Sequence, residues 1–379
     1  MSKEKNKFKV EFTLKQHTPI IHFQSEQVGA TLRATELKPK FDRFLIQQND
    51  DLPKKKNANG SLFLEYKVKI TAIESNIEDI EKKNPNNGKE KTDPLFFGNM
   101  GDGKKKKFIS SKEIQIEFKS FDTNIRQAIQ KYFEAFLANT NFGTRQSKGY
   151  GSFYINNSKF NKDLIPYKVY SFSTTKWKED IKLFYSFLRQ GINLKNKYET
   201  TFYSKPAIFS YAKSKGWTWD KKAIKRRYFK GILEQQDGDV VHYSSSQEYL
   251  LRDLFGLSSS QEWGRDYRNA KIEKEDKRKD EEGKPMLQRF QSPLTFKVVD
   301  NRVYFWVNKT VDYMLNQTFT IKAGKKEGLE LKTPEIFDFN DFFEFTFSIN
   351  LRSHIKEKYH NQKEYKDLEK MLNKIKENG

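Results

Sequence analysis

Two helical patterns separate four strand-like segments in the first 155 residues of the chain. Alternating apolar residues predict strands over residues 8–14, 61–70, 114–118 and 151–155. Apolar residues recur at helical spacing over 32–45 and over 125–137, and Asp122 is a suitable N-cap for the second of these helices. The order strand, helix, strand, strand, helix, strand matches the ferredoxin-like arrangement. We therefore predict an α+β fold for this part of the chain.

A chain of 379 residues is longer than one typical domain. Residues 156–175 are polar and form a candidate boundary, after which a new helical pattern begins over 181–188. We therefore expect two domains, residues 1–165 and residues 166–379. Stretches rich in Lys, Asn and Gly, such as 81–107, predict long insertions between the regular elements.

The second half of the chain carries further local patterns. They predict a helix over 246–255 that Gly256 stops, a mobile charged loop over 265–284, a hairpin of 294–299 and 302–307 around Asp300-Asn301, a strand-like alternation over 342–351, and a C-terminal helix over 364–376. Almost every residue of the charged loop is charged or small, so we expect it to order only when a partner binds.

The charge of the chain favours a polyanionic partner. Lys and Arg number 71 against 50 Asp and Glu, which gives a formal net charge of +21 and a pI near 9.6. Nucleic acid fits better than an anionic membrane, because 33 Phe, 18 Tyr and 5 Trp offer faces for bases as well as a core. The lack of cysteine excludes disulfides, thiolate zinc sites and cysteine nucleophiles. Without a signal-like or membrane-spanning apolar run, we expect a cytoplasmic protein that does not engage membranes.

The segment GTRQSKGYG, from Gly143 to Gly151, is the leading candidate for a phosphate site. Glycines at positions 143, 149 and 151 allow sharp turns and expose backbone N–H groups. Its other candidate contacts are Thr144, Arg145, Gln146, Ser147 and Lys148, which offer two cations and three neutral hydrogen-bonding side chains. A plain glycine-rich turn between a helix and a strand remains the alternative.

Two basic helical segments extend the candidate RNA surface. Four cations surround the first predicted helix: Arg33, Lys38, Lys40 and Arg43. We expect Glu36 and Asp42 to orient them. A second group, Lys225, Arg226 and Arg227, lies on a helix that begins near Asp220, just after two tryptophans. Solvated basic helix faces are the alternative interpretation of both groups.

Signatures of catalysis are weak in this sequence. The histidines are His17, His22, His242, His354 and His360. His22 is the best acid–base candidate, because it lies in the loop before the first basic helix, although a solvated or structurally bonded histidine is the simpler interpretation. The carboxylates form no DxD or HD arrangement, and no GxxxxGK[ST] loop occurs. We therefore predict no catalytic residue, no metal, no cofactor and no small-molecule substrate.

Several short motifs occur in the order found in one protein superfamily. They are Thr18-Pro19 after the first strand, then Leu32-Arg33, Leu37-Lys38, Phe41 and Arg43, then FGTRQSKGYGSF, and in the second half LRDLFGL (251–257) and QSPL (291–294). Together they resemble the RAMP superfamily of CRISPR type III effector subunits, and within it most closely the first subunit of the type III-B (Cmr) complex. Two positions depart from that pattern, since Pro39 replaces a glycine and Ser147 replaces an arginine.

The resemblance implies two ferredoxin-like (RRM-like) domains with long insertions. It implies a non-catalytic, RNA-binding subunit that holds the 3′ region of the guide RNA, or the matching end of the target RNA, in antiviral defence. The implied partners are guide RNA, target RNA or both, and other CRISPR effector subunits. Because the related endonucleases that process CRISPR repeat RNA share this fold, a metal-independent endoribonuclease that uses His22 is the alternative.

Overall fold

The computed structural model describes residues 7–21, 31–83, 90–92, 107–196, 198–230, 247–263, 267, 269–324 and 327–378. The chain forms helices and several mostly antiparallel sheets, so the predicted α+β class is confirmed. Its contacts divide it into two compact units, the first comprising residues up to Ile181 together with Thr295–Trp306, and the second comprising Lys182–Leu294 and Val307–Asn378. The domain boundary expected near residue 165 stays a prediction, because a division by contacts does not define independently folding domains.

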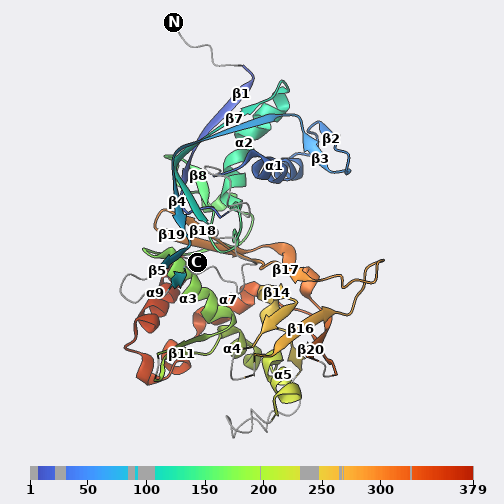
Figure 1. Ribbon diagram of the computed structural model, residues 1–379. Helices are drawn as coiled ribbons and strands as arrows, with labels where there is room; N and C mark the ends of the chain where they lie inside the picture. The colour runs from blue at the N-terminus through green and yellow to red at the C-terminus, as the bar shows by residue number, and fades with distance from the viewer. Residues whose placement is uncertain are drawn as a thin grey trace. The chain divides into compact units, whose positions relative to one another are not determined.

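A four-stranded antiparallel sheet forms the frame of the first unit (Figure 1). Its strands, in spatial order, are β4 (Lys67–Asp79), β7 (Lys107–Lys119), β1 (Lys9–Gln16) and β8 (Phe153–Ile155). Apolar residues pair across one face, as in Val10 with Phe118 and Leu14 with Ile114. This pairing places the whole apolar set of each strand on the same side, as the period-two alternation predicts.

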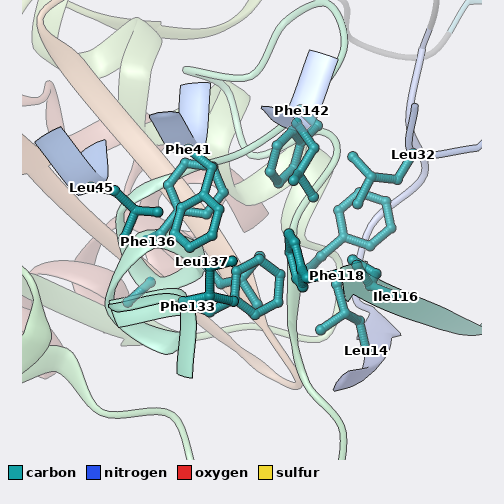
Figure 2. Close-up of a cluster of buried hydrophobic side chains, with 14 of the residues drawn as sticks. Leu14, Leu32, Phe41, Leu45, Ile116, Phe118, Phe133, Phe136, Leu137 and Phe142 are labelled. Atoms are coloured by element: carbon teal, nitrogen blue, oxygen red, sulfur yellow. The ribbon is translucent and has the colours of Figure 1, made fainter. Parts of the chain in front are cut away.

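Helices α1 (Ala34–Gln48) and α2 (Thr123–Asn139) cover the apolar side of this sheet. Asp122 caps α2 by accepting a hydrogen bond from the N–H of Ile125 at 2.9 Å, as predicted. Aromatic rings fill the core between helices and sheet (Figure 2), and the ring centroids of Phe41 and Phe136 are 4.8 Å apart. Both rings are fully buried, so the aromatic residues of this unit serve chiefly as core.

The single strand predicted over 61–70 is wrong, because the chain breaks it into two. β3 (Leu62–Leu64) pairs with β2 (Lys54–Lys56) as a separate hairpin. The chain then turns at Glu65, where the N–H of Tyr66 donates to the carbonyl of Leu64, and β4 begins two residues later.

The predicted hairpin around Asp300-Asn301 is confirmed, and it belongs to the first unit. Strands β18 (Leu294–Val299) and β19 (Arg302–Val307) form a three-stranded sheet with β9 (Tyr170–Ser173). The other elements of this part of the chain are β5 (Glu81–Lys83), β6 (Glu90–Thr92), the 3-10 turn Lys162–Leu164 and α3 (Trp177–Arg189), whose residues from Lys182 onward belong to the second unit.

A six-stranded sheet forms the frame of the second unit. Its strands, in spatial order, are β12 (Thr218–Trp219), β13 (Glu248–Tyr249), β21 (Leu329–Lys332), β20 (Thr318–Ala323), β16 (Lys271–Asp276) and β15 (Ser260–Glu262). Two smaller pairs are β10 (Ile192–Lys195) with β11 (Thr200–Ser204), and β14 (Leu257–Ser258) with β17 (Arg289–Phe290). The helices are α4 (Ala207–Ser214), α5 (Asp220–Tyr228), α7 (Phe339–Ser348), α8 (Leu351–His354) and α9 (Lys363–Asn378), with 3-10 turns at Arg252–Phe255, Lys309–Met314 and Glu357–Tyr359.

Three predictions for the second unit are wrong, whereas the C-terminal helix is confirmed as α9. In the segment predicted as a helix over 246–255, the described residues form β13 and a 3-10 turn. The charged segment 265–284 contains β16, which pairs with β15 and β20. Residues predicted as a strand over 342–351 lie mainly in α7, which Asp338 caps. The phenylalanines of this segment fit the alternating pattern of a strand as well as the spacing of a helix, so the pattern alone does not distinguish the two.

Long-range ion pairs explain why such a charged strand lies inside a sheet. Lys274 of β16 is 1% exposed and forms an ion pair with the buried Asp253. Its ammonium group also lies 3.6 Å from Asp220, which binds Arg252 at 2.7 Å. Burial raises the pKa of Asp220, but the charges of Arg252 and Lys274 outweigh it and lower that pKa to about 2. Two acidic and two basic side chains therefore lie together inside the unit, within ion-pair distance of one another.

Candidate nucleic-acid interface

The segment Gly143–Gly151 forms a closed loop between α2 and β8. Its ends meet where the N–H of Phe142 donates to the carbonyl of Gly151 at 2.9 Å. A Cβ on Gly151 would lie 1.9 Å from the carbonyl oxygen of Phe142, and the φ of Gly151 is +66°. Only glycine fits there, because both the close approach and the left-handed backbone exclude a side chain.

Residues that follow β1 anchor the loop from one side. The N–H of Thr144 donates to the carbonyl of Ile21 at 2.8 Å, and the N–H of Gly151 donates to the carbonyl of Pro19 at 2.9 Å. The hydroxyl of Thr18 also donates to the carbonyl of Gly149 at 2.7 Å. These bonds use backbone groups at both ends of the loop and hold it against the segment that follows β1.

The peptide groups in the middle of the loop have a defined orientation. The carbonyl of Gln146 accepts from the side chain of buried Asn141 at 2.7 Å, and the carbonyl of Ser147 accepts from the N–H of Phe296 at 3.1 Å. A trans peptide points its C=O and N–H in opposite directions. The N–H of Ser147 therefore points away from Asn141. Within the described ranges, no group accepts a hydrogen bond from the N–H of Gln146 or of Ser147.

The two cations of the loop differ in exposure. Lys148 is 3% exposed, and its ammonium group lies 5.8 Å from the ring centroid of Phe296 on β18. Arg145 is half-buried and has a φ of +61°, in the left-handed region. Burial lowers the pKa of the Arg145 guanidinium, which nevertheless stays charged at neutral pH. Arg145 is thus the loop cation that reaches the surface.

Two side chains of α1 form hydrogen bonds with the loop. Lys40 donates to the side-chain oxygen of Gln146 at 2.9 Å and forms an ion pair with Glu36 at 2.8 Å. Glu36 also accepts from the N–H of Gly143 at 2.7 Å. The expectation that Glu36 orients a neighbouring cation is therefore confirmed, and Glu36 also binds the loop directly.

The other α1 cations lie away from the loop contacts. Lys38 forms an ion pair with Asp42 at 2.7 Å, as expected, and donates to the carbonyl of Leu64 at 2.8 Å. Arg43 is exposed, and Arg33 is half-buried at the N-cap of the helix. Lys40 thus contacts the loop, whereas Arg43 is a solvent-exposed cation further along α1.

Sequence reasoning missed Lys297, which lies under the loop. Its ammonium group is buried and donates to the carbonyls of Thr140 at 3.0 Å and Phe153 at 3.2 Å, and to the side chain of Asn141 at 3.3 Å. Burial lowers the pKa of Lys297 to about 7. No local signal identifies it, because a lysine in an alternating strand is the ordinary outward-facing residue.

The predicted cations of the second unit all lie on α5. The ammonium group of Lys225 is 4.8 Å from the ring centroid of Tyr267. Arg226 forms an ion pair with Glu248, and Arg227 forms one with Glu327 at 2.6 Å. Each therefore has an aromatic or acidic neighbour within its own unit.

The described histidines each bond to backbone atoms. Nδ1 of His17 accepts from the N–H of Asp300 at 3.1 Å, and burial lowers the pKa of His17 to about 4 despite the nearby Asp300 carboxylate. Nε2 of His354 and of His360 lie 2.9 and 2.8 Å from the carbonyls of Lys205 and Ile355. His22 and His242 lie outside the described residues.

Among the described residues, no group of three or more His, Asp and Glu side chains is placed to hold a metal ion. No helix in that part of the chain has both the length and the apolar character needed to cross a membrane.

Family models identify the chain. The model of the Cmr1 N-terminal domain matches residues 7–192, and the model of the Cmr1 C-terminal domain matches residues 203–377. No curated protein matches the sequence. With two mixed α+β units and matches across almost its whole length, the chain is a RAMP-type subunit of a type III CRISPR effector. It belongs to the Cmr1 family of the type III-B complex, which confirms the family predicted from the sequence motifs.

Proposed function

We propose that this Cmr1-family chain is a non-catalytic RNA-binding subunit of the effector. It acts in the cytoplasm beside the other Cmr subunits, and it holds the 3′ region of the guide RNA or the matching end of the target RNA. Membership of the family supports a place in the effector complex. The glycine loop Gly143–Gly151 supports the RNA contact.

The orientation of the Ser147 peptide carries the proposal. Its N–H points away from Asn141, and no described residue accepts a hydrogen bond from it or from the N–H of Gln146. Arg145 places a cation directly before these two donors. Successive backbone N–H groups beside a left-handed residue, with a guanidinium next to them, are suited to a phosphate.

The remaining predicted residues have distinct roles in this proposal. Gly143, Thr144, Lys148, Gly149 and Gly151 shape the loop, together with Lys40. Arg33, Lys38 and Arg43 extend the positive surface along α1, and Lys225, Arg226 and Arg227 form a second basic surface on α5. The resulting contacts are to phosphates and are therefore largely independent of base sequence.

We also infer a ferredoxin-like fold for both units. The support in the first unit is the spatial order β4, β7, β1, β8 with every neighbour antiparallel, and one helix after β1 and another after β7. The solvent face of this sheet carries no aromatic residue in the three rows that run from Lys9 to Thr13 of β1. Bases therefore do not stack there as they do on the sheet of a typical RRM.

Replacing Ser147 tests the proposed N–H contact. Ser147→Pro removes the N–H, whereas Ser147→Ala keeps it. We expect Ser147→Pro to raise the Kd for a single-stranded RNA roughly tenfold or more, and Ser147→Ala to change it less than about twofold. Fluorescence anisotropy measures the Kd, and urea unfolding of each variant shows whether the loop change has affected the fold.

A salt titration tests the charge contribution in the same assay. Arg145→Ala should reduce the slope of log K against log salt by about 0.7, the value for one contact to a single-stranded phosphate. Affinity that does not depend on salt would contradict the proposal. If Ser147→Pro and Arg145→Ala both bind like the wild type, the loop is only a turn.

The endoribonuclease alternative depends on His22, which lies outside the described residues. We expect a CRISPR repeat RNA to stay intact when incubated with the protein without metal. A discrete cut that disappears in His22→Ala would establish the alternative instead.

A further inference from the structure

Two aromatic rings are exposed at the end of the first unit's sheet that is opposite the glycine loop. Phe121, in the turn between β7 and α2, is 87% exposed, and Phe8, just before β1, is 43% exposed. Their centroids are 5.2 Å apart in an edge-to-face arrangement. β1 starts beside this pair and ends beside the loop, so roughly 24 Å of strand separates the two sites.

Hydrogen bonds hold the turn that carries Phe121 against the backbone of Phe8. The N–H of Ser120 donates to the carbonyl of Phe8 at 3.1 Å, and the guanidinium of Arg126 donates to the carbonyl of Ser120 at 2.8 Å. The same guanidinium lies 5.7 Å from the ring centroid of Phe8. Because the backbone of the turn is already ordered, stacking of another flat group on the ring costs no further backbone entropy.

Three lysines lie in one row across the solvent face of the sheet, one residue along the chain from Phe8, whose ring lies on the helix side beside Arg126. Lys67 of β4, Lys119 of β7 and Lys9 of β1 are register partners. Like charges directly opposite each other destabilise a sheet. Glu117 partly offsets them, because it pairs with both Lys9 and Lys119.

The next row contains Lys69, Glu117 and Glu11, and Asp122 caps α2 close by. Arg126 adds a further cation on the helix side. Cations therefore outnumber carboxylates around the exposed rings, which favours an anionic partner.

We propose that Phe8 and Phe121 form a base-stacking site for single-stranded RNA, with the lysine row binding the adjacent phosphates. The observation that points to RNA is the combination of flat exposed rings with a net positive border, which matches an unpaired base and its phosphates. An apolar patch of a partner subunit would need the rings but not the lysine row. This inference rests on the proposed RNA-binding function and adds a second contact at the far end of β1.

Substitutions at Phe121 separate stacking from charge. Phe121→Ala should raise the Kd of the full chain for single-stranded RNA about 5- to 150-fold without changing the salt slope, whereas Phe121→Trp should keep wild-type affinity. Lys119→Ala should instead lower the slope by about 0.7. Tyr198→Ala, which removes an 86% exposed ring in the second unit, is the matched control and should bind like the wild type.

Cross-linking locates the contact directly. An RNA that carries 5-iodouridine should cross-link to Phe121 or Phe8, as mapped by mass spectrometry. If Arg145→Ala weakens binding while Phe121→Ala does not, the loop proposal stands and the stacking site is wrong. If Phe121→Ala leaves RNA affinity intact but releases a partner subunit from the purified complex, the rings are a protein contact and the inference is overturned. Absence of RNA binding by the wild-type chain would reject the proposed function itself.

Discussion

At the residue scale, two buried lysines contribute contacts within and beside the glycine loop. Lys148, a residue of the loop, is 3% exposed, and Lys297, which binds the segments that flank the loop, is 0% exposed. The sequence predicts the positions of the loop glycines and the pairing of Glu36 with a neighbouring cation, because these depend on local spacing. It does not predict the burial of Lys148, which depends on Phe296, a residue from a hairpin far along the chain.

Lys297 should make the stability of the protein depend on pH. Its pKa is about 7 in the folded protein, below the value of 10.5 for an unperturbed lysine. Between these values the unfolded chain binds the additional proton, so the free energy of unfolding rises with pH. From pH 7.5 to pH 9.0 the contribution of Lys297 is about 2 kcal/mol. Lys297→Met should remove that increase.

Urea unfolding of wild type and variant at the two pH values measures the effect of Lys297. Other titrating groups contribute to both proteins and cancel in the difference. Lys112→Met, at a side chain that is 71% exposed, is the control and should keep the wild-type pH dependence. An equal rise in stability for wild type and Lys297→Met would show that the ammonium group is not the source.

At the element scale, local signals explain which predictions succeeded. α2 has a capping aspartate and a regular apolar stripe, and the β18–β19 hairpin has a turn whose Asp300 adopts a φ of +50°. β16 has no such signal. The charge of its buried Lys274 is compensated by Asp253 and Asp220, which come from the 3-10 turn Arg252–Phe255 and from α5. A prediction that assigns charged segments to loops from composition alone does not take into account ion pairs with other segments of the chain.

Removing Lys274 from β16 should destabilise the protein strongly. Lys274→Met leaves Asp253 and Asp220 buried with less compensating charge, and breaking a buried ion pair in this way costs about 3–5 kcal/mol. Lys271→Met on the same strand removes a pair with Glu273 whose lysine is 66% exposed, so its effect should be below about 1 kcal/mol. Urea unfolding compares the two, and equal effects would contradict a structural role for the buried cluster.

At the scale of the whole molecule, the first unit is discontinuous in sequence. The segment Thr295–Trp306 belongs to it, although the residues on either side belong to the second unit. This segment supplies Lys297 beneath the loop and the Phe296 N–H that binds the carbonyl of Ser147. The N-terminal family match, residues 7–192, therefore does not contain everything that the first unit needs.

A fragment of residues 1–192 should consequently be less stable than the same fragment joined through a short linker to residues 293–308. The shorter fragment lacks the buried side chains of Phe296, Val298 and Phe305, and each large apolar side chain of this kind contributes about 1.5–3 kcal/mol when buried. Circular dichroism during urea unfolding measures the difference. Identical transitions in the two fragments would show that the hairpin adds nothing to the first unit.

The late position of the β18–β19 hairpin also sets the order of events during synthesis. The ribosome completes Gly151 about 150 residues before it completes Trp306. At about 5–20 residues per second, this interval lasts roughly 8–30 s. During that time the nascent loop lacks the backbone partner that orients Ser147, and any chain that terminates early never acquires it. The loop can therefore form all of its contacts only after the β18–β19 hairpin has been synthesised. Chains that end before this hairpin lack the hydrogen bond from Phe296 to Ser147.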